Sequence, residues 1–458
     1  MLLNDKESKS LSMHNLVRFP AKLHPPFVKW AIERYTQPGD VILDPFCGCG
    51  TVVLEATLSG RRAIGFDVDP YSAYIAHAKC NPPKKAAFDR VAARLKASLE
   101  DLERFAHTYL RLEKEDITLP YYRTQIAEHR VPRIPNISHW FKHYIIVDLL
   151  NIWSKIRDRQ DPPRLKRYVR TSFASILRLC SNADPDTLSG LEVTKRMRAW
   201  LRRGRYLNPI TMFANRLDRN SDPLLEKYWS QARELPRRYS ARVRASSALD
   251  GRSYRGLTGR VRAIITSPPY CSAVEYQRRH ALEHYWLGFL RYESDIPALR
   301  KRYVGRRNYV PGTIATLLDD LPKRVREDLA GYLGPHLESK MSRVRAIAAY
   351  FVEMQKWLAL AAKQLAPGGH LVLVVGDSTV GGRPVKTADL LAQLAPRGLR
   401  LSSRFSYVLR NRSMQYSRWN HANVTAEQVM VFTKTRSASR TRSGRTGQRV
   451  RLAPPARH

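Results

Sequence analysis

Hydrophobic positions near the start of the chain follow two different repeat lengths. Residues 25–35 carry apolar side chains at helical spacing and begin with two prolines, which suit the first turn of a helix. Short apolar runs at 41–44 and 61–67 predict buried strands, and the segments 51–60 and 70–79 that follow them predict helices. Strand, glycine-containing turn, helix, strand and helix in this order predict the opening of a doubly wound parallel sheet.

The same rhythm returns in the second half of the chain. An apolar run at 261–265 predicts another buried strand, and it ends in the sequence Thr-Ser-Pro-Pro-Tyr at 266–270. Two consecutive prolines prevent further ladder pairing, so the strand must stop there. The remaining predicted elements are helices at 273–290, 343–365 and 385–394 and strands at 370–378, 401–409 and 427–434. The last two strands predict an antiparallel pair at the end of an otherwise mostly parallel sheet, and the fold class is α/β.

Long polar and basic stretches interrupt the sheet pattern. We interpret residues 1–80 and 246–435 as two parts of one domain, with a large helical insertion at 81–245 between them. A smaller polar insertion is expected at about 291–340. Residues 436–458 contain seven arginines and no acidic residue, a low-complexity composition that predicts a disordered basic tail.

The charge of the chain indicates a kind of partner. Lys and Arg total 79 against 40 Asp and Glu, which gives a formal net charge of +39 over 458 residues. Such an excess repels itself unless a polyanion neutralises it. The basic stretches at 195–206, 300–309 and 410–419 also carry aromatic residues, which favours nucleic acid over anionic lipid because bases stack on rings.

Neither a membrane segment nor a signal peptide is expected from the sequence. No apolar run reaches membrane-spanning length, and the first residues lack a long apolar stretch. We therefore expect a soluble cytoplasmic protein, associated with the nucleoid if the source is a prokaryote. The five cysteines match no disulfide framework and no zinc-site spacing, so we expect reduced thiols and no metal ion.

A glycine-containing turn follows the first predicted strand. Its sequence is Asp-Pro-Phe-Cys-Gly-Cys-Gly-Thr at 44–51, and Gly48 and Gly50 allow the backbone to approach a ligand closely. Asp67 ends the next strand, where a carboxylate can accept hydrogen bonds from ribose hydroxyls. The turn lacks a Walker-type lysine and the full G-x-G-x-x-G spacing, which disfavours ATP and NAD.

This turn, the sequence Gly-Phe-Asp-Val-Asp-Pro at 65–70 and the Ser-Pro-Pro-Tyr corner together resemble one enzyme family. It comprises the S-adenosylmethionine-dependent DNA methyltransferases that modify exocyclic amino groups. The resemblance implies a seven-stranded methyltransferase sheet and S-adenosylmethionine as the cofactor. The cofactor-binding residues that it implies are Asp44, Pro45, Phe46, Gly48, Gly50, Thr51 and Asp67, together with Phe19 and Lys22 of the segment resembling the one that closes over the methionine end.

The same resemblance assigns the chemistry to Ser267, Pro268, Pro269 and Tyr270. The amino nitrogen of cytosine or adenine is a poor nucleophile because its lone pair is delocalised into the ring. The Ser267 hydroxyl and a carbonyl of the proline corner can accept its N–H groups and free that lone pair for direct displacement. Tyr270 supplies a flat surface for a base turned out of the duplex. No covalent enzyme intermediate is needed, so Cys271 is not expected to act as a nucleophile.

Structural roles stay open for several of these residues. The proline corner could be a plain strand-ending turn. Asp44 could brace the glycine turn or contact the cofactor's amino group, and Asp377 could simply end its strand. The family often has an acidic residue that touches adenine before the catalytic strand. Here a serine stands in that place and Asp250 is displaced.

The serine that opens the second motif resembles the cytosine-N4 enzymes more than the adenine-N6 enzymes. Cytosine N4 in double-stranded DNA is therefore the predicted target, with adenine N6 as the alternative. An RNA amino-methyltransferase and a non-catalytic DNA-binding protein on the same scaffold are further alternatives. The resemblance allows a cognate restriction endonuclease as a partner, and the sequence indicates no oligomeric state. Candidate nucleic-acid-binding residues, as a group, are Arg196, Arg202, Arg203, Arg306 and Arg307 in the two insertions.

Overall fold

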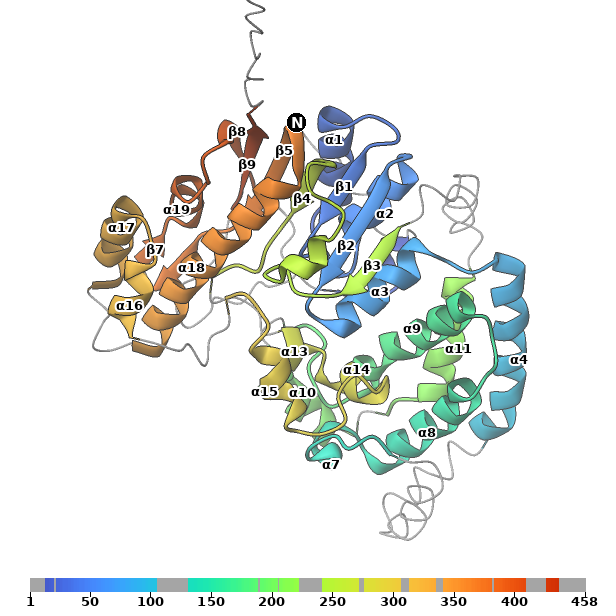
Figure 1. Ribbon diagram of the computed structural model, residues 1–458. Coiled ribbons are helices and arrows are strands. Elements are labelled where there is room, and N and C mark those ends of the chain that lie inside the picture. Colours follow the sequence, from blue (N-terminus) through green and yellow to red (C-terminus); the bar gives the residue numbers. More distant parts are fainter. Residues whose placement is uncertain are drawn as a thin grey trace, which may run out of the picture.

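A seven-stranded sheet forms the centre of the protein, in the order β3-β2-β1-β4-β5-β9-β8 (Figure 1). The computed structural model describes residues 13–19, 22–104, 131–187, 190–204, 206–221, 241–271, 276–305, 313–334, 341–380, 383–408 and 426–435. The strands of the sheet are β1 (Val41–Asp44), β2 (Arg62–Asp67), β3 (Arg242–Ala245), β4 (Val261–Thr266), β5 (Leu365–Val375), β8 (Leu399–Val408) and β9 (Ala426–Lys434). Neighbours from β3 to β5 are parallel, and β9 is antiparallel to β5 and β8. This order confirms the predicted α/β class, its mostly parallel sheet and the antiparallel terminal pair.

Helices cover both faces of the sheet, and each face has its own buried core. Successive side chains of a strand point to opposite faces, so Val372 and Val374 of β5 join one core while Leu371 and Leu373 join the other. Helices of the first core include α1 (Pro25–Tyr35), α2 (Thr51–Leu58) and α3 (Pro70–Cys80), and those of the second include α18 (Met341–Gln364) and α19 (Thr387–Gln393). The continuous apolar run of β5 therefore reflects burial on both faces, as in other parallel sheets between helix layers.

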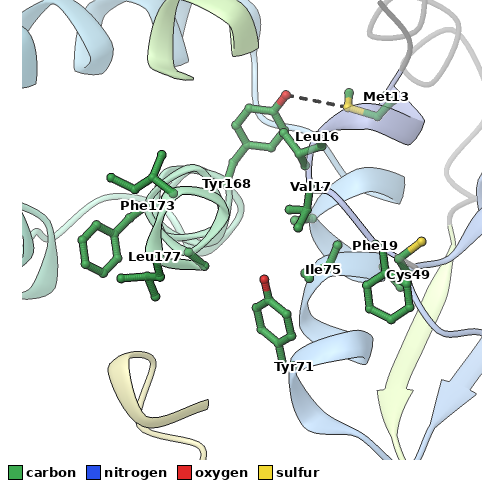
Figure 2. Close-up of a cluster of buried hydrophobic side chains, with 14 of the residues drawn as sticks. Met13, Leu16, Val17, Phe19, Cys49, Tyr71, Ile75, Tyr168, Phe173 and Leu177 are labelled. Carbon is green, nitrogen blue, oxygen red and sulfur yellow. Dashed lines mark hydrogen bonds between the residues drawn. The ribbon is translucent and has the colours of Figure 1, made fainter. Parts of the chain in front are cut away.

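The large insertion packs onto the first core (Figure 1). Its described helices are α4 (Lys85–Arg104), α7 (Ile137–Trp140), α8 (His143–Arg157), α9 (Pro163–Cys180), α10 (Lys195–Arg202) and α11 (Pro209–Asn220). Figure 2 shows side chains of the N-terminal segment, such as Leu16 and Val17, next to Tyr168 of α9 and Ile75 of α3. The Tyr168 hydroxyl donates to Met13 Sδ at 3.7 Å. The insertion and the sheet thus share one core.

The second insertion contributes a smaller group of helices. It contains α15 (Asp295–Arg300), α16 (Ile314–Asp319) and α17 (Lys323–Leu333). Helix α16 packs against α18, and α17 packs against α19 and a two-stranded hairpin of β6 (Ser378–Val380) and β7 (Arg383–Val385). Figure 1 shows this group at the left edge of the view, whereas the large insertion lies below the sheet.

Three elements differ from the sequence-based expectation. Residues 242–245, which we assigned to the insertion, form the edge strand β3, and its mostly exposed side chains give it no apolar pattern. Strand β5 begins at Leu365 instead of residue 370, because Leu365 pairs with Val261 before a register shift in the ladder. The helix expected at 273–290 is replaced, in its described part, by α13 (Tyr276–Arg279) and α14 (Ala281–Trp286). His280 between them has non-helical backbone angles and separates the two.

The basic tail at 436–458 lies outside the described residues. Within the part of the chain that the structure describes, no helix has the length and apolar character needed to span a membrane. The five cysteines are buried and form no disulfide.

Candidate active site

Both sequence motifs lie at the same edge of the sheet. Strands β1 and β4 are parallel neighbours with Leu43 opposite Ile264, so the end of β1 at Asp44 lies beside the end of β4 at Thr266. The strand order reverses here, because β2 and β5 lie on the outer sides of this pair. Ligands of open α/β sheets bind outside the carboxyl ends of the strands at such a switch point. The glycine turn and the proline corner therefore flank one candidate site.

A cavity of about 800 Å³, its open mouth included, lies at this edge. A volume of this order is common for small-molecule sites. The residues from the sequence analysis that line it are Phe19, Lys22, Asp44, Pro45, Phe46, Gly48, Thr51, Asp67, Ser267 and Pro269. Gly50, Pro268 and Tyr270 are not in the lining. Both motifs thus contribute residues to a single cavity.

Backbone geometry explains the two glycines of the turn. Gly48 has φ of +47° and Gly50 has φ of +84°, values in the left-handed region that favours glycine. A Cβ atom on Gly50 would lie 2.8 Å from the Cβ of Ala76, so α2 and α3 can pack this closely only around a glycine. The Gly48 N–H donates to Asp67 Oδ2 at 2.8 Å. This bond ties the turn after β1 to the end of β2.

The Asp67 carboxylate has both oxygens engaged by backbone donors. Oδ2 accepts from Gly48, and Oδ1 accepts from the N–H of Asp69 at 2.9 Å. Burial, together with the nearby Asp69 carboxylate, raises the pKa of Asp67. A carboxylate has about four acceptor positions, so these two bonds leave capacity for hydroxyl donors of a ligand.

Asp44 links the two motifs directly. The Thr266 hydroxyl at the end of β4 donates to Asp44 Oδ1 at 2.6 Å, and the Phe46 N–H donates to the same oxygen at 3.2 Å. Burial raises the pKa of Asp44 to about 7, against the effect of these two hydrogen bonds. Asp44 therefore braces the glycine turn and also joins it to the strand that carries the proline corner.

The cavity offers groups that fit S-adenosylmethionine. Thr51 is the first residue of α2, and its buried Oγ1 has no hydrogen-bond partner, although buried polar atoms are normally paired. Lys22 Nζ donates to the His14 carbonyl at 3.0 Å, and burial lowers the pKa of its ammonium group. Phe19 packs over Gly48 and stacks on His280 with 5.0 Å between ring centroids. A hydroxyl, a cation, a carboxylate and an aromatic wall suit the amino-acid, ribose and apolar parts of this cofactor.

The proline corner is anchored on its far side. The Ser378 hydroxyl donates to the carbonyl of Cys271 at 2.7 Å, just after the corner. Asp377 accepts from the N–H of Thr387 at 3.0 Å, so it holds the start of α19. Cys271 is buried, and this burial raises the pKa of its thiol, which disfavours the thiolate form.

The second insertion supplies part of the cavity wall, through residues 302–304. The buried Tyr303 donates its hydroxyl proton to Asp69 Oδ2 at 2.5 Å, and the Gly305 N–H donates to Glu353 Oε2 at 3.2 Å. These bonds tie the segment to the start of α3 and to α18. From the sequence we assigned this insertion to DNA contacts, and no motif there indicates a cavity wall.

Residues after β3 line another part of the cavity. Ser247 and Ala248 face it, in the region where the family often has an acidic residue. Asp250 instead accepts from the N–H of Arg252 at 2.9 Å and starts the 3₁₀-helix η4 (Gly251–Tyr254). Further lining residues that the sequence analysis did not single out are Leu23, Val52, Val68, Ser72 and Tyr276.

The candidate nucleic-acid-binding arginines have different surroundings. Arg196 forms ion pairs with Asp184 and with Asp186, the latter at 2.6 Å, so its charge is already partly compensated. Arg202 and Arg203 are exposed at the end of α10 and do not line the cavity. Arg306 and Arg307 lie outside the described residues. Binding of nucleic acid by these residues stays a prediction.

Comparison with known proteins identifies relatives of this chain. The family model described as DNA methylase, of the N6 and N4 type, matches residues 3–78. The Type II methyltransferase M.BsoBI of Geobacillus stearothermophilus is 26% identical over 303 residues, which cover 63% of this chain and 55% of that protein. The Type II methyltransferase M.MvaI of Kocuria varians is 21% identical over 390 residues, which cover 83% of this chain and 80% of that protein.

A shorter match involves an RNA enzyme. The tRNA (guanine(10)-N2)-dimethyltransferase of Methanothermobacter thermautotrophicus is 38% identical over 52 residues, which cover 11% of this chain and 16% of that protein. This chain spans about half the length of M.BsoBI and most of M.MvaI. The family match and the two long alignments agree with the cavity formed by the two motifs, and they place the chain in the N6/N4 DNA methylase family, whose methyl donor is S-adenosylmethionine.

Proposed function

We propose that this protein transfers a methyl group from S-adenosylmethionine to the exocyclic N4 amino group of cytosine in double-stranded DNA. The observation that carries the proposal is the shared cavity, which Ser267 and Pro269 line together with the glycine turn. A group held by the turn and a base held by the corner would lie side by side in this arrangement. Direct displacement requires that proximity.

Residues of the cavity have separable roles in the proposal. Asp67 would accept hydrogen bonds from the ribose hydroxyls, while Thr51 and Lys22 would hold the amino-acid end of the cofactor. When bound, S-adenosylmethionine supplies an electrophilic methyl group. The Ser267 Oγ and a carbonyl of the proline corner would accept the two N–H groups of the target nitrogen and so release its lone pair. The buried Pro268 and the anchored chain after it would keep these acceptors fixed.

The choice of cytosine N4 over adenine N6 rests on the serine at the first position of the proline motif. The family members with serine there resemble the cytosine enzymes more than the adenine enzymes. The test is to incubate the purified protein with methyl-labelled S-adenosylmethionine and plasmid DNA, then digest the DNA and identify the modified nucleoside by mass spectrometry. We expect N4-methylcytosine, and N6-methyladenine as the main product would overturn the cytosine assignment.

A serine variant tests the role of the corner. Ser267→Ala removes the proposed hydroxyl acceptor, so we expect the rate of methyl transfer to fall by about 100-fold or more, with cofactor binding retained. Ser154→Ala is the matched control, because Ser154 Oγ donates within helix α8 to the Asn151 carbonyl at 2.8 Å. Wild-type activity in Ser267→Ala, combined with intact DNA binding, would support the non-catalytic alternative instead.

RNA is the second candidate substrate, because of the short match to a tRNA methyltransferase. The labelling reaction should therefore be run in parallel on duplex DNA and on total RNA at equal nucleotide concentration. We expect label in DNA. Preferential label in RNA would keep the fold and cofactor but replace the proposed substrate.

A further inference from the structure

A glutamate on the terminal strand pair holds the tyrosine of the proline corner. The Tyr270 hydroxyl donates to Glu427 Oε1, and the Tyr407 hydroxyl donates to Glu427 Oε2. Tyr407 and Glu427 are directly opposite each other in the antiparallel pair of β8 and β9. Both carboxylate oxygens thus have a phenol donor, from separate parts of the chain.

The packing around this glutamate restricts its movement. The Tyr407 ring packs on Phe27 of α1 with 5.5 Å between ring centroids. Burial, followed by the nearby Glu427 carboxylate, raises the pKa of Tyr270 well above its usual value, so its hydroxyl keeps its proton. Tyr270 therefore acts as a donor towards Glu427, and its own oxygen remains able to accept a hydrogen bond.

Ser267 provides the next member of the series. Its side chain is a hydrogen-bonding neighbour of the Tyr270 hydroxyl and acts in the sense of a donor, because it lowers the pKa of that phenol. The series therefore runs from Ser267 to Tyr270 to Glu427. Since an ionised carboxylate can only accept hydrogen bonds, the glutamate at the end determines the direction of every bond before it.

We propose that Glu427 is a positioning residue that sets the direction of this hydrogen-bond chain and thereby leaves the Ser267 oxygen free to accept from the target amino group. A serine hydroxyl has one proton and two lone pairs. With the proton directed to Tyr270, the lone pairs are available to the substrate. With the chain reversed, the Ser267 proton would point at the amino group and oppose its binding.

This inference rests on the proposed amino-methyltransferase function, and substitution of the glutamate tests it. In Glu427→Gln the amide can donate to Tyr270 and permit the reversed chain. We expect kcat for methyl transfer to plasmid DNA to fall about 10- to 100-fold. Cofactor affinity, measured by calorimetric titration with S-adenosylmethionine, should not change, because Glu427 does not line the cavity. Tyr270→Phe keeps the ring, breaks the same chain and should show a similar loss.

A double variant separates this role from a general structural one. If Glu427 acts through Ser267, Glu427→Gln should cause no further loss of kcat in a Ser267→Ala background, whereas independent effects would multiply. The matched control is Asp389→Asn, which removes a carboxylate that pairs with Arg404 on the surface of β8. It should leave kcat unchanged.

The possible results are distinct. Unchanged kcat in Glu427→Gln, a parallel loss of cofactor affinity, or multiplicative losses in the double variant would each overturn the positioning role while the methyltransferase function stands. A wild-type protein that methylates no nucleic acid would overturn both. Melting temperatures verify folding, and if Glu427→Gln fails to fold, Tyr270→Phe tests the same chain.

Discussion

Hydroxyl donors from distant segments hold the buried carboxylates of this protein. Thr266 donates to Asp44, Tyr303 to Asp69 and Tyr270 to Glu427. Charge-assisted hydrogen bonds are stronger than neutral ones, and a buried carboxylate without donors is costly. At the scale of single residues, these bonds determine how the strand ends and loops around the cavity are joined.

The bond between Thr266 and Asp44 gives a stability prediction. Thr266→Val leaves the buried carboxylate with only its backbone donor, so we expect the free energy of unfolding to fall by about 1–3 kcal/mol. The loss should be larger at pH 8 than at pH 5, because Asp44 with its pKa of about 7 is charged only at the higher pH. Thr266→Ser retains a hydroxyl and serves as the control. Equal melting temperatures of the valine variant and the wild type at pH 8 would contradict the role of this bond.

A second residue-scale prediction concerns Asp148 in α8. Burial raises the pKa of Asp148 to about 7, and its Oδ1 has no hydrogen-bond partner. The unfolded chain has a lower pKa, so between pH 4 and pH 7 the folded state binds more protons and stability decreases as pH rises. Asp148→Asn carries no charge and should exceed the wild type in stability by about 1–3 kcal/mol at pH 8, with little difference near pH 4.

Thermal unfolding at the two pH values measures this effect. Asp158→Asn, at the exposed C-terminal end of the same helix, is the control and should show no such gain at pH 8. A stability difference between Asp148→Asn and the wild type that stays constant from pH 4 to pH 8 would show that the charge of Asp148 is not its cause.

At the scale of elements, the close contact of α2 and α3 shapes the glycine turn. Gly50→Ala would place a Cβ 2.8 Å from the Cβ of Ala76, in addition to the strain of φ at +84°. We expect it to lower both stability and cofactor affinity. Gly60→Ala has a similar φ of +73° with nothing within 4 Å, so it isolates the backbone strain, which should cost about 1 kcal/mol. Equal effects of the two substitutions on S-adenosylmethionine binding would argue against the packing explanation.

The segment 302–304 gives a second prediction at this scale. Tyr303→Phe removes the bond to Asp69 that ties this wall of the cavity to the start of α3. We expect the Kd for S-adenosylmethionine to rise about 5- to 10-fold, in line with the loss of one hydrogen bond. Tyr292→Phe, on an exposed tyrosine before α15, should leave the Kd unchanged. A Kd for Tyr303→Phe equal to that of the wild type would mean that this segment does not shape the site.

At the scale of the whole molecule, the net charge of +39 predicts binding to nucleic acid that depends strongly on salt. We expect affinity for duplex DNA to fall at least about 100-fold between 50 and 200 mM salt, since each phosphate contact contributes a slope of about 0.9. Removing residues 436–458 deletes seven arginines and should make this slope shallower. A filter-binding series on both proteins measures the two slopes. Identical slopes would exclude the tail from DNA contact.

The sequence by itself determined the α/β class, the two motifs and the residues of the glycine turn. These features are local: apolar runs set strands, and glycines and prolines fix the turns that end them. Even Asp44 and Thr266 could be expected to lie at one edge, because the carboxyl ends of parallel strands meet there. The order of the central strands thus needed little beyond the pattern along the chain.

Only the tertiary structure decided which distant side chains complete the site. Tyr303 and Asp69 are 234 positions apart, and Tyr270 and Glu427 are 157 positions apart. Strand β3 also lacks an apolar pattern and is defined by its pairing with β2. No local pattern encodes such pairs, because packing of the whole chain brings them together, and a hydrogen bond depends on the distance between two atoms in space.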